Sequence, residues 1–174
     1  MSILDWLRGA GSPASAPHGD TDTVRRIMAE LDRLEPSRAR YLAAFAYVLS
    51  RVANADLDIS EEETTRMVEL VRQAGQLAED QALLVVEIAK RQNRLFGGTE
   101  NFLVTREFRE IASDDERRQL LACLFAVAAA DEEITGEEES QISQIASELG
   151  LEHADYVNAR LAYSDKRSVF KRTP

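Results

Sequence analysis

Cysteine and histidine are scarce in this chain of 174 residues, and their scarcity argues against several chemistries. The single cysteine, Cys123, cannot form an internal disulfide, and it stands in the apolar run 120–125, where we expect a buried side chain rather than a nucleophile. The two histidines, His18 and His153, lack a glutamate three residues earlier, so the di-iron Glu-x-x-His signature is missing. No catalytic triad, zinc-ligand spacing or phosphate-binding glycine loop is present. We therefore expect a protein that is not an enzyme.

Long apolar runs and strand patterns are also missing. No run approaches the roughly 20 apolar residues of a membrane-spanning helix, and the N-terminus does not have the pattern of a signal peptide. There is no sustained alternation of apolar and polar residues between turn signals, which argues against a sheet. With 44% hydrophobic and 30% charged residues, the composition is typical of a soluble helical protein. We expect a cytoplasmic location.

Negative charge is in excess, with a formal net charge of −10. Residues 164–174 carry four basic side chains against Asp165, a local charge of +3, so residues 1–163 carry −13. Such a body repels nucleic acid and suits cations or basic partners. We expect a protein partner and no nucleic acid, and no feature of the sequence favours one oligomeric state over another.

A twelve-residue block occurs twice, as residues 52–63 and again as residues 127–138, at an offset of 75 without a gap. In each copy an alanine-rich helix end meets an aspartate, then an isoleucine, then a Ser/Thr-x-x-Glu capping box that opens the next helix. The register continues to Gly75 and Gly150, which we expect to end those helices. The repeat predicts two pseudo-symmetric helical hairpins, at about 36–77 and 114–151.

Apolar residues recur at three and four positions from Thr21 onward, as they do in amphipathic helices. We expect helices at about 21–35, 36–55, 60–75, 79–93, 99–111, 113–127, 135–150 and 153–163. Ser60, Ser113 and Thr135 should cap three of them. The predicted fold is an all-α, compact bundle of about seven or eight helices with two helix-hairpin half-repeats. The predicted division is an N-terminal segment and linker (1–20), a helical domain (21–163) and a basic tail (164–174).

The two repeated turns are rich in acids: residues 56–63 hold five carboxylates and residues 131–139 hold six. Glutamates in the first turn of a helix are explained by the helix dipole. Asp56 and Asp131 follow a helix C-terminus, so each needs a partner, which is either the N–H groups of the turn or a cation. The later half of each block matches an EF-hand loop, but Val52 and Val127 stand where the first ligand would be, which excludes a complete EF-hand.

Two interpretations of the acidic turns stay open at this point: helix caps, or a weak site for a divalent cation such as calcium or magnesium or for a basic peptide. The candidate residues for the site are Asp56, Asp58, Glu62, Glu63, Asp131, Glu133, Glu137 and Glu138.

The N-terminus carries a short amphipathic segment built from Ile3, Leu4, Trp6 and Leu7, followed by a Gly/Pro/Ser/Ala-rich linker over residues 9–19. Such a segment can insert at a membrane interface, dock on a partner, or fold back on its own domain. A peripheral contact with the inner membrane is therefore the alternative to a purely cytoplasmic location.

The repeated Ala-Asp-x-x-Ile-Ser/Thr-x-Glu-Glu block, at residues 55–63 and 130–138, resembles the TerB-like tellurite-resistance family, over residues 21–163. The closing pattern Gly150-Leu151-x4-Tyr156-Val157 is also similar to the end of that family's domain. The domain also precedes the J-domain of some membrane-anchored DnaJ-like co-chaperones. The resemblance implies an all-α, internally duplicated fold and an acidic surface for metal or partner binding in stress responses, without a settled catalytic activity.

Overall fold

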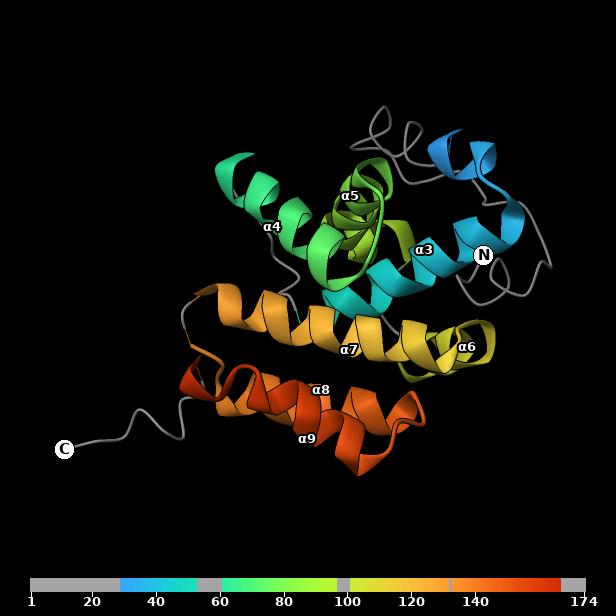
Figure 1. Ribbon diagram of the computed structural model, residues 1–174. Coiled ribbons are helices and arrows are strands. Elements are labelled where there is room, and N and C mark those ends of the chain that lie inside the picture. Colours follow the sequence, from blue (N-terminus) through green and yellow to red (C-terminus); the bar gives the residue numbers. More distant parts are fainter. Residues whose placement is uncertain (1–28, 53–60, 97–100, 132, 167–174) are drawn as a thin grey trace.

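A computed structural model describes residues 29–52, 61–96, 101–131 and 133–166, and within these ranges the chain is helical without a β-strand (Figure 1). Residues 29–33 are helical and are followed by the elements that we label as in Figure 1. They are α3 (Pro36–Ser50), α4 (Glu61–Ala74), α5 (Glu79–Phe96), α6 (Asn101–Ile111), α7 (Asp114–Ala128), the 3-10 turn η1 (Ala129–Asp131), α8 (Gly136–Glu148), α9 (His153–Leu161) and the 3-10 turn η2 (Ser164–Lys166). The prediction of an all-α bundle is confirmed.

Helix α7 lies through the middle of the molecule, with α3, α4 and α5 on one side of it and α8 and α9 on the other (Figure 1). Helix α6 contacts both α3 and α8 and so joins the two sides. Just before α8 begins, the Ile134 N–H donates to the carbonyl of Lys166, the last residue of η2, at 2.8 Å. This bond holds η2 beside the start of α8.

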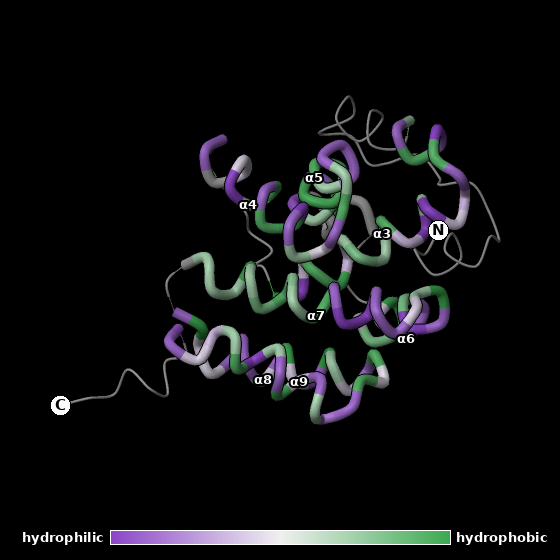
Figure 2. The backbone as a smooth tube through the Cα atoms, viewed as in Figure 1, coloured by the Kyte–Doolittle hydropathy of each residue, from purple (hydrophilic) through white to green (hydrophobic). Residues whose placement is uncertain are grey.

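The core forms around α3 and α7 because these helices are apolar on most of their circumference. Every residue of α3 from Tyr41 to Ser50 is buried, and α7 is buried from Cys123 to Ala128. Three rings, those of Tyr41, Phe45 and Phe108, pack together with centroids 5.3–6.1 Å apart. The outer helices are amphipathic, and Figure 2 shows hydrophilic residues at the first turns of α4 and α7.

Two of the three predicted capping boxes are present. The Ser113 hydroxyl accepts from the Glu116 N–H, and Glu116 accepts in return from the Ser113 N–H at 2.7 Å. Thr135 and Glu138 form the same reciprocal pair at the start of α8. Ser60, predicted to cap α4, lies outside the described residues.

Several predicted boundaries shift. Helix α3 begins at Pro36 as predicted, but it ends at Ser50 rather than near Ala55, and residues 53–60 lie outside the described part of the chain. Helix α5 runs on to Phe96, three residues past its predicted end. Helix α9 ends at Leu161, because the chain turns into η2.

Gly75 directly follows Ala74, the last residue of α4, so it ends that helix as predicted, and the left-handed conformation falls on the next residue, Gln76, with φ 55°. The Leu77 N–H then donates to the Arg72 carbonyl at 3.1 Å, which closes the helix in a Schellman-like arrangement. Position 75 has no room for a side chain, because a Cβ there would lie 2.6 Å from the Val71 carbonyl oxygen and 3.1 Å from the Phe45 ring. Gly150 does end α8 with φ 69°, as predicted.

The second helices of the two predicted half-repeats begin at equivalent positions. Helix α4 begins at residue 61 and α8 at residue 136, which is the offset of 75 found in the sequence. Their left-handed residues, Gln76 and Gly150, differ by 74, so α4 continues one residue further than its counterpart. The pseudo-symmetry of the two hairpins stays a prediction.

Candidate functional site

The acids at the start of α4 and α8 face solvent. Glu61 and Glu62 are exposed in the first turn of α4, and Glu133 and Glu137 are exposed at the start of α8. Figure 1 shows both first turns toward the same side of the molecule, with the end of α7 between them. The acidic turns therefore concentrate negative charge at one end of the bundle.

The structure leaves part of the predicted site undescribed. Asp56 and Asp58 lie outside the described residues, and so do the side chains of Glu63 and Asp131. Among the side chains that are described, no group of three or more histidine, cysteine, aspartate or glutamate residues is placed to hold a metal ion.

Glu138 already has a structural role in the capping box. One of its carboxylate oxygens accepts from both the N–H and the hydroxyl of Thr135, each at 2.8 Å. Its carboxylate thereby satisfies an N–H at the helix start, where a negative charge is also favoured by the helix dipole. This geometry accounts for Thr135-x-x-Glu138, in the second copy of the block, without a bound ion.

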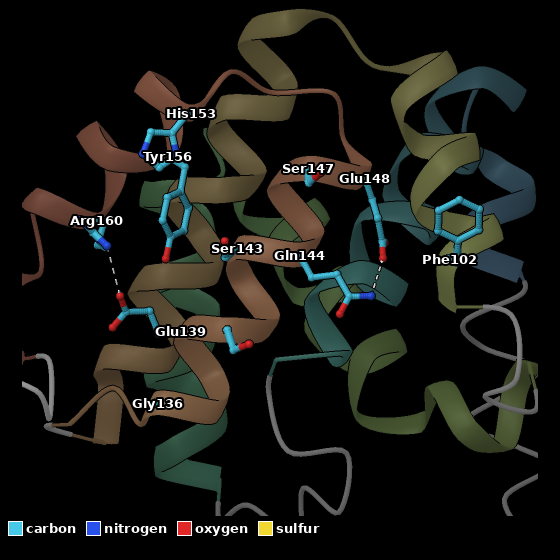
Figure 3. Close-up of a pocket in the computed structure, with 11 residues that line it drawn as sticks. Phe102, Gly136, Glu139, Ser143, Gln144, Ser147, Glu148, His153, Tyr156 and Arg160 are labelled. Carbon is cyan, nitrogen blue, oxygen red and sulfur yellow. Dashed lines mark hydrogen bonds and ion pairs between the residues drawn. The ribbon is translucent and has the colours of Figure 1, made fainter.

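The acidic start of α8 continues into a groove with about 910 Å³ of space that follows the exposed face of α8 (Figure 3). Serines form its floor, at positions 140, 143 and 147, which recur at the three- and four-residue spacing of one helix face. Phe102 of α6, 54% exposed, stands on one side, and His153, Tyr156 and Arg160 of α9 stand on the other. The groove thus combines small residues, aromatic walls and an acidic end.

Arg160 and Tyr156 form the wall of the groove on the α9 side. The Arg160 Nη1 atom lies 3.4 Å from Glu139 Oε1 of α8, and its guanidinium carbon lies 5.4 Å from the centre of the Tyr156 ring. The His153 ring lies near the same ring, with centroids 6.2 Å apart and the ring planes tilted by 34°. The contact between Arg160 and Glu139 joins α9 to α8 along the groove, and the two ring contacts lie within α9.

A buried ion pair closes the other end of the groove. Arg51, directly after α3, places Nη1 2.5 Å from Glu148 Oε2 and 2.7 Å from the Thr105 hydroxyl, with the two charged side chains only 5% and 7% exposed. Gln144 donates to the same carboxylate at 2.9 Å. The network joins α3, α6 and α8, and Glu148 also lines the groove.

Neither the groove nor this network is predicted from the sequence. A signal for the ion pair was available, because Arg51 stands between the apolar residues Leu49 and Val52, and Glu148 directly precedes Leu149. A charge inside an apolar run is seldom buried unless it is paired. The groove had no such signal, since its floor of serines is indistinguishable in sequence from a solvated helix face.

The predicted docking residues Ile3, Leu4, Trp6 and Leu7 lie outside the described residues. In the part that is described, no helix is both long and apolar enough to cross a membrane.

Together these features define a class: an all-α bundle with an acidic end and an open surface groove. The comparison with protein families identifies it further, because the model of the family described as tellurite resistance protein TerB matches residues 41–161. The chain therefore belongs to the TerB family. Searches of curated proteins and of solved structures gave no significant match.

Proposed function

We propose that this TerB-family chain is a non-enzymatic binding module of stress responses, and that it takes a basic protein partner along α8. The observation that carries the proposal is the continuity between the acidic first turn of α8 and the groove along that helix. Glu139 belongs to both, since it lies in the first turn and lines the groove.

The chemistry of the groove suits a partner helix with basic and apolar side chains. Small side chains at Ser140, Ser143 and Ser147 allow a backbone to approach closely, and Phe102 supplies exposed aromatic surface of the kind enriched at interfaces. Glu133 and Glu137 offer exposed carboxylates to lysine or arginine at one end. Because exposed charges are screened by salt, binding should weaken as the ionic strength rises.

The test is an NMR titration of the full chain with a designed helical peptide of lysine and leucine, compared with the same peptide carrying glutamate for lysine. We expect shifts at Gly136, Ser140 and Ser143 with the basic peptide alone. The substitution Ser143→Trp should block binding, because it fills the groove, and Gln73→Trp on the exposed face of α4 is the matched control.

Charge is tested separately. Glu137→Gln should weaken binding of the basic peptide, whereas Glu79→Gln, in the exposed first turn of α5, should not. Equal binding of the acidic peptide, or shifts that avoid α8, would contradict the proposal. A screen for phosphatase and nuclease activity with magnesium or manganese tests the non-enzymatic part, and any turnover there would refute it.

A divalent cation at the acidic turns is the second candidate, favoured by the exposed first-turn acids that α4 and α8 present on one side of the molecule. A calcium titration followed by NMR tests it. Specific shifts at both Asp56 and Asp131 are expected if the two turns bind the ion, and shifts at neither would exclude it.

The membrane-surface alternative is tested by flotation with liposomes, comparing the full chain with a chain that begins at Asp20. Flotation of the full chain alone would assign Ile3, Leu4, Trp6 and Leu7 to a membrane contact.

A further inference from the structure

A second pocket lies on the other side of α7, between the helical residues 29–33 with Leu34 and the start of α5. It holds about 400 Å³, within the roughly 300–1,000 Å³ typical of ligand pockets, and it is more enclosed than the groove along α8. Leu34, Leu83 and Leu84 supply its apolar surface, and Leu83 is 49% exposed there. A half-exposed leucine beside two partly buried ones is an incomplete hydrophobic contact.

The rim of this pocket is acidic. Glu30, Asp80 and Glu87 line it together with Gln81, and none of its lining residues is basic. Arg33 pairs with Glu30 at 3.0 Å, and Lys90 lies 3.8 Å from Glu87, but both bases sit within one helical turn of their partners and outside the lining. The pocket therefore suits an apolar segment that carries a basic residue next to its apolar side chains.

The chain itself contains such a segment, and it enters the described fold at the wall of the pocket. Glu30, the second described residue, belongs to that wall, so everything N-terminal to it is tethered there. Ile3, Leu4, Trp6 and Leu7 are apolar, and Arg8 follows directly. Twenty residues, 9–28, separate Arg8 from the first described residue. A flexible coil of that length spans about 22–27 Å on average, so the local concentration of the segment is in the millimolar range.

The other terminal segment is a poorer candidate. Residues 167–174 also contain basic residues beside Val169 and Phe170. However, the chain reaches them from Lys166, which is bonded to Ile134 beside the start of α8, on the far side of α7 from the pocket (Figure 1).

We propose that residues 3–8 fold back and dock in the pocket formed by Leu34, Leu83 and Leu84, with Trp6 on the leucines and Arg8 at the acidic rim. Docking covers Leu83 and removes the N-terminal apolar surface from solvent. The contact is independent of the partner site proposed along α8, since it uses different elements on the other side of α7. It also makes release of the segment a precondition for any membrane contact.

Trp6 is the only tryptophan of the chain, so its fluorescence reports on the segment directly. In the full chain we expect blue-shifted emission and slow quenching by acrylamide, relative to a synthetic peptide of residues 1–20. Leu83→Asp should shift the emission to that of the free peptide and raise the quenching constant severalfold. Because Leu83 is half-exposed, this substitution leaves the core intact, which circular dichroism checks.

Three further variants make the result specific. Leu161→Asp alters an exposed leucine of α9 on the other side of α7 and should leave the emission unchanged. Leu7→Asp alters the segment instead of the pocket and should reproduce the effect of Leu83→Asp. Removal of residues 167–174 should change nothing.

The proposal is overturned if Trp6 in the full chain emits and quenches like the free peptide, or if Leu83→Asp has no effect. A blue shift that disappears on dilution would also overturn it, because docking within one chain is independent of concentration. Emission that shifts only when vesicles of phosphatidylethanolamine and phosphatidylglycerol are added would instead assign the segment to a membrane.

Discussion

Arg51 and Glu148, 97 positions apart, meet in the interior with 2.5 Å between Arg51 Nη1 and Glu148 Oε2. Thr105 and Gln144 supply two more hydrogen bonds, while Arg51 Nε has no partner among the described residues. The pair therefore ties the end of α3 to the end of α8 through charge instead of apolar packing.

Removing one partner of this pair should be costly, because the other charge stays buried without compensation. Glu148→Leu is expected to lower the free energy of unfolding by about 3–5 kcal/mol, measured by urea denaturation. The double variant with Arg51→Met should recover much of that loss, since it removes both charges. Additive losses in the double variant would contradict this account, and Arg72→Ala, in an exposed pair with Glu69, should change stability little.

Gly75 and Gln76 should respond in opposite directions to substitution. Gly75→Ala should destabilise the fold by roughly 1–3 kcal/mol, because the new Cβ has no room beside Val71 and Phe45. Gln76→Gly should stabilise it by up to about 1 kcal/mol, because a left-handed conformation is unfavourable for a residue with a side chain. Thermal unfolding shows whether each variant is more or less stable than the native sequence. A stabilised Gly75→Ala would show that the glycine has no packing role.

The helices, two capping boxes and the role of Gly150 could be predicted because each depends on residues close together in sequence. The need for a glycine at position 75 could not, since it depends on the close approach of Phe45, thirty residues away in sequence. The acids of the candidate site could be predicted because their charge is visible in the sequence. The groove could not, because it depends on how α6 and α9 lie beside α8. Contacts such as Arg160 with Glu139 belong to tertiary packing and leave no local pattern.

Cys123 should make stability fall at alkaline pH. Its thiol is fully buried, and burial raises its pKa to about 12, against about 8.5 in an unfolded chain. A raised native pKa gives a contribution that is complete below about pH 8.5 and is lost as the pH rises toward 12. Burial also raises the pKa of Tyr41, but tyrosine affects the pH dependence of stability only from about pH 10, where it ionises in an unfolded chain. The range from about pH 8.5 to 10 therefore reports on the cysteine alone.

The measurement is the free energy of unfolding at several pH values between 8 and 10. The fall seen in the native sequence should flatten in Cys123→Ala, even though that variant starts from a lower stability because of its smaller side chain. The native thiol should also react with a thiol reagent only at the rate of unfolding, and fast labelling of the folded chain would show that it is accessible.

Thr135 and Glu138 separate the capping role of the acidic turn from a binding role. Thr135→Ala should lower the free energy of unfolding by about 0.5–2 kcal/mol, because the Glu138 N–H loses the oxygen that it donates to. Glu138→Gln should cost much less, since glutamine also serves at this position of a capping box. If Glu138 is a cation ligand, however, the same substitution removes a charge from the site and should weaken calcium binding. Denaturation and calcium titration of Glu138→Gln therefore distinguish the two roles. Unchanged stability with weakened calcium binding would assign the carboxylate to an ion. Unchanged stability with an unchanged calcium response would assign it to the helix start alone.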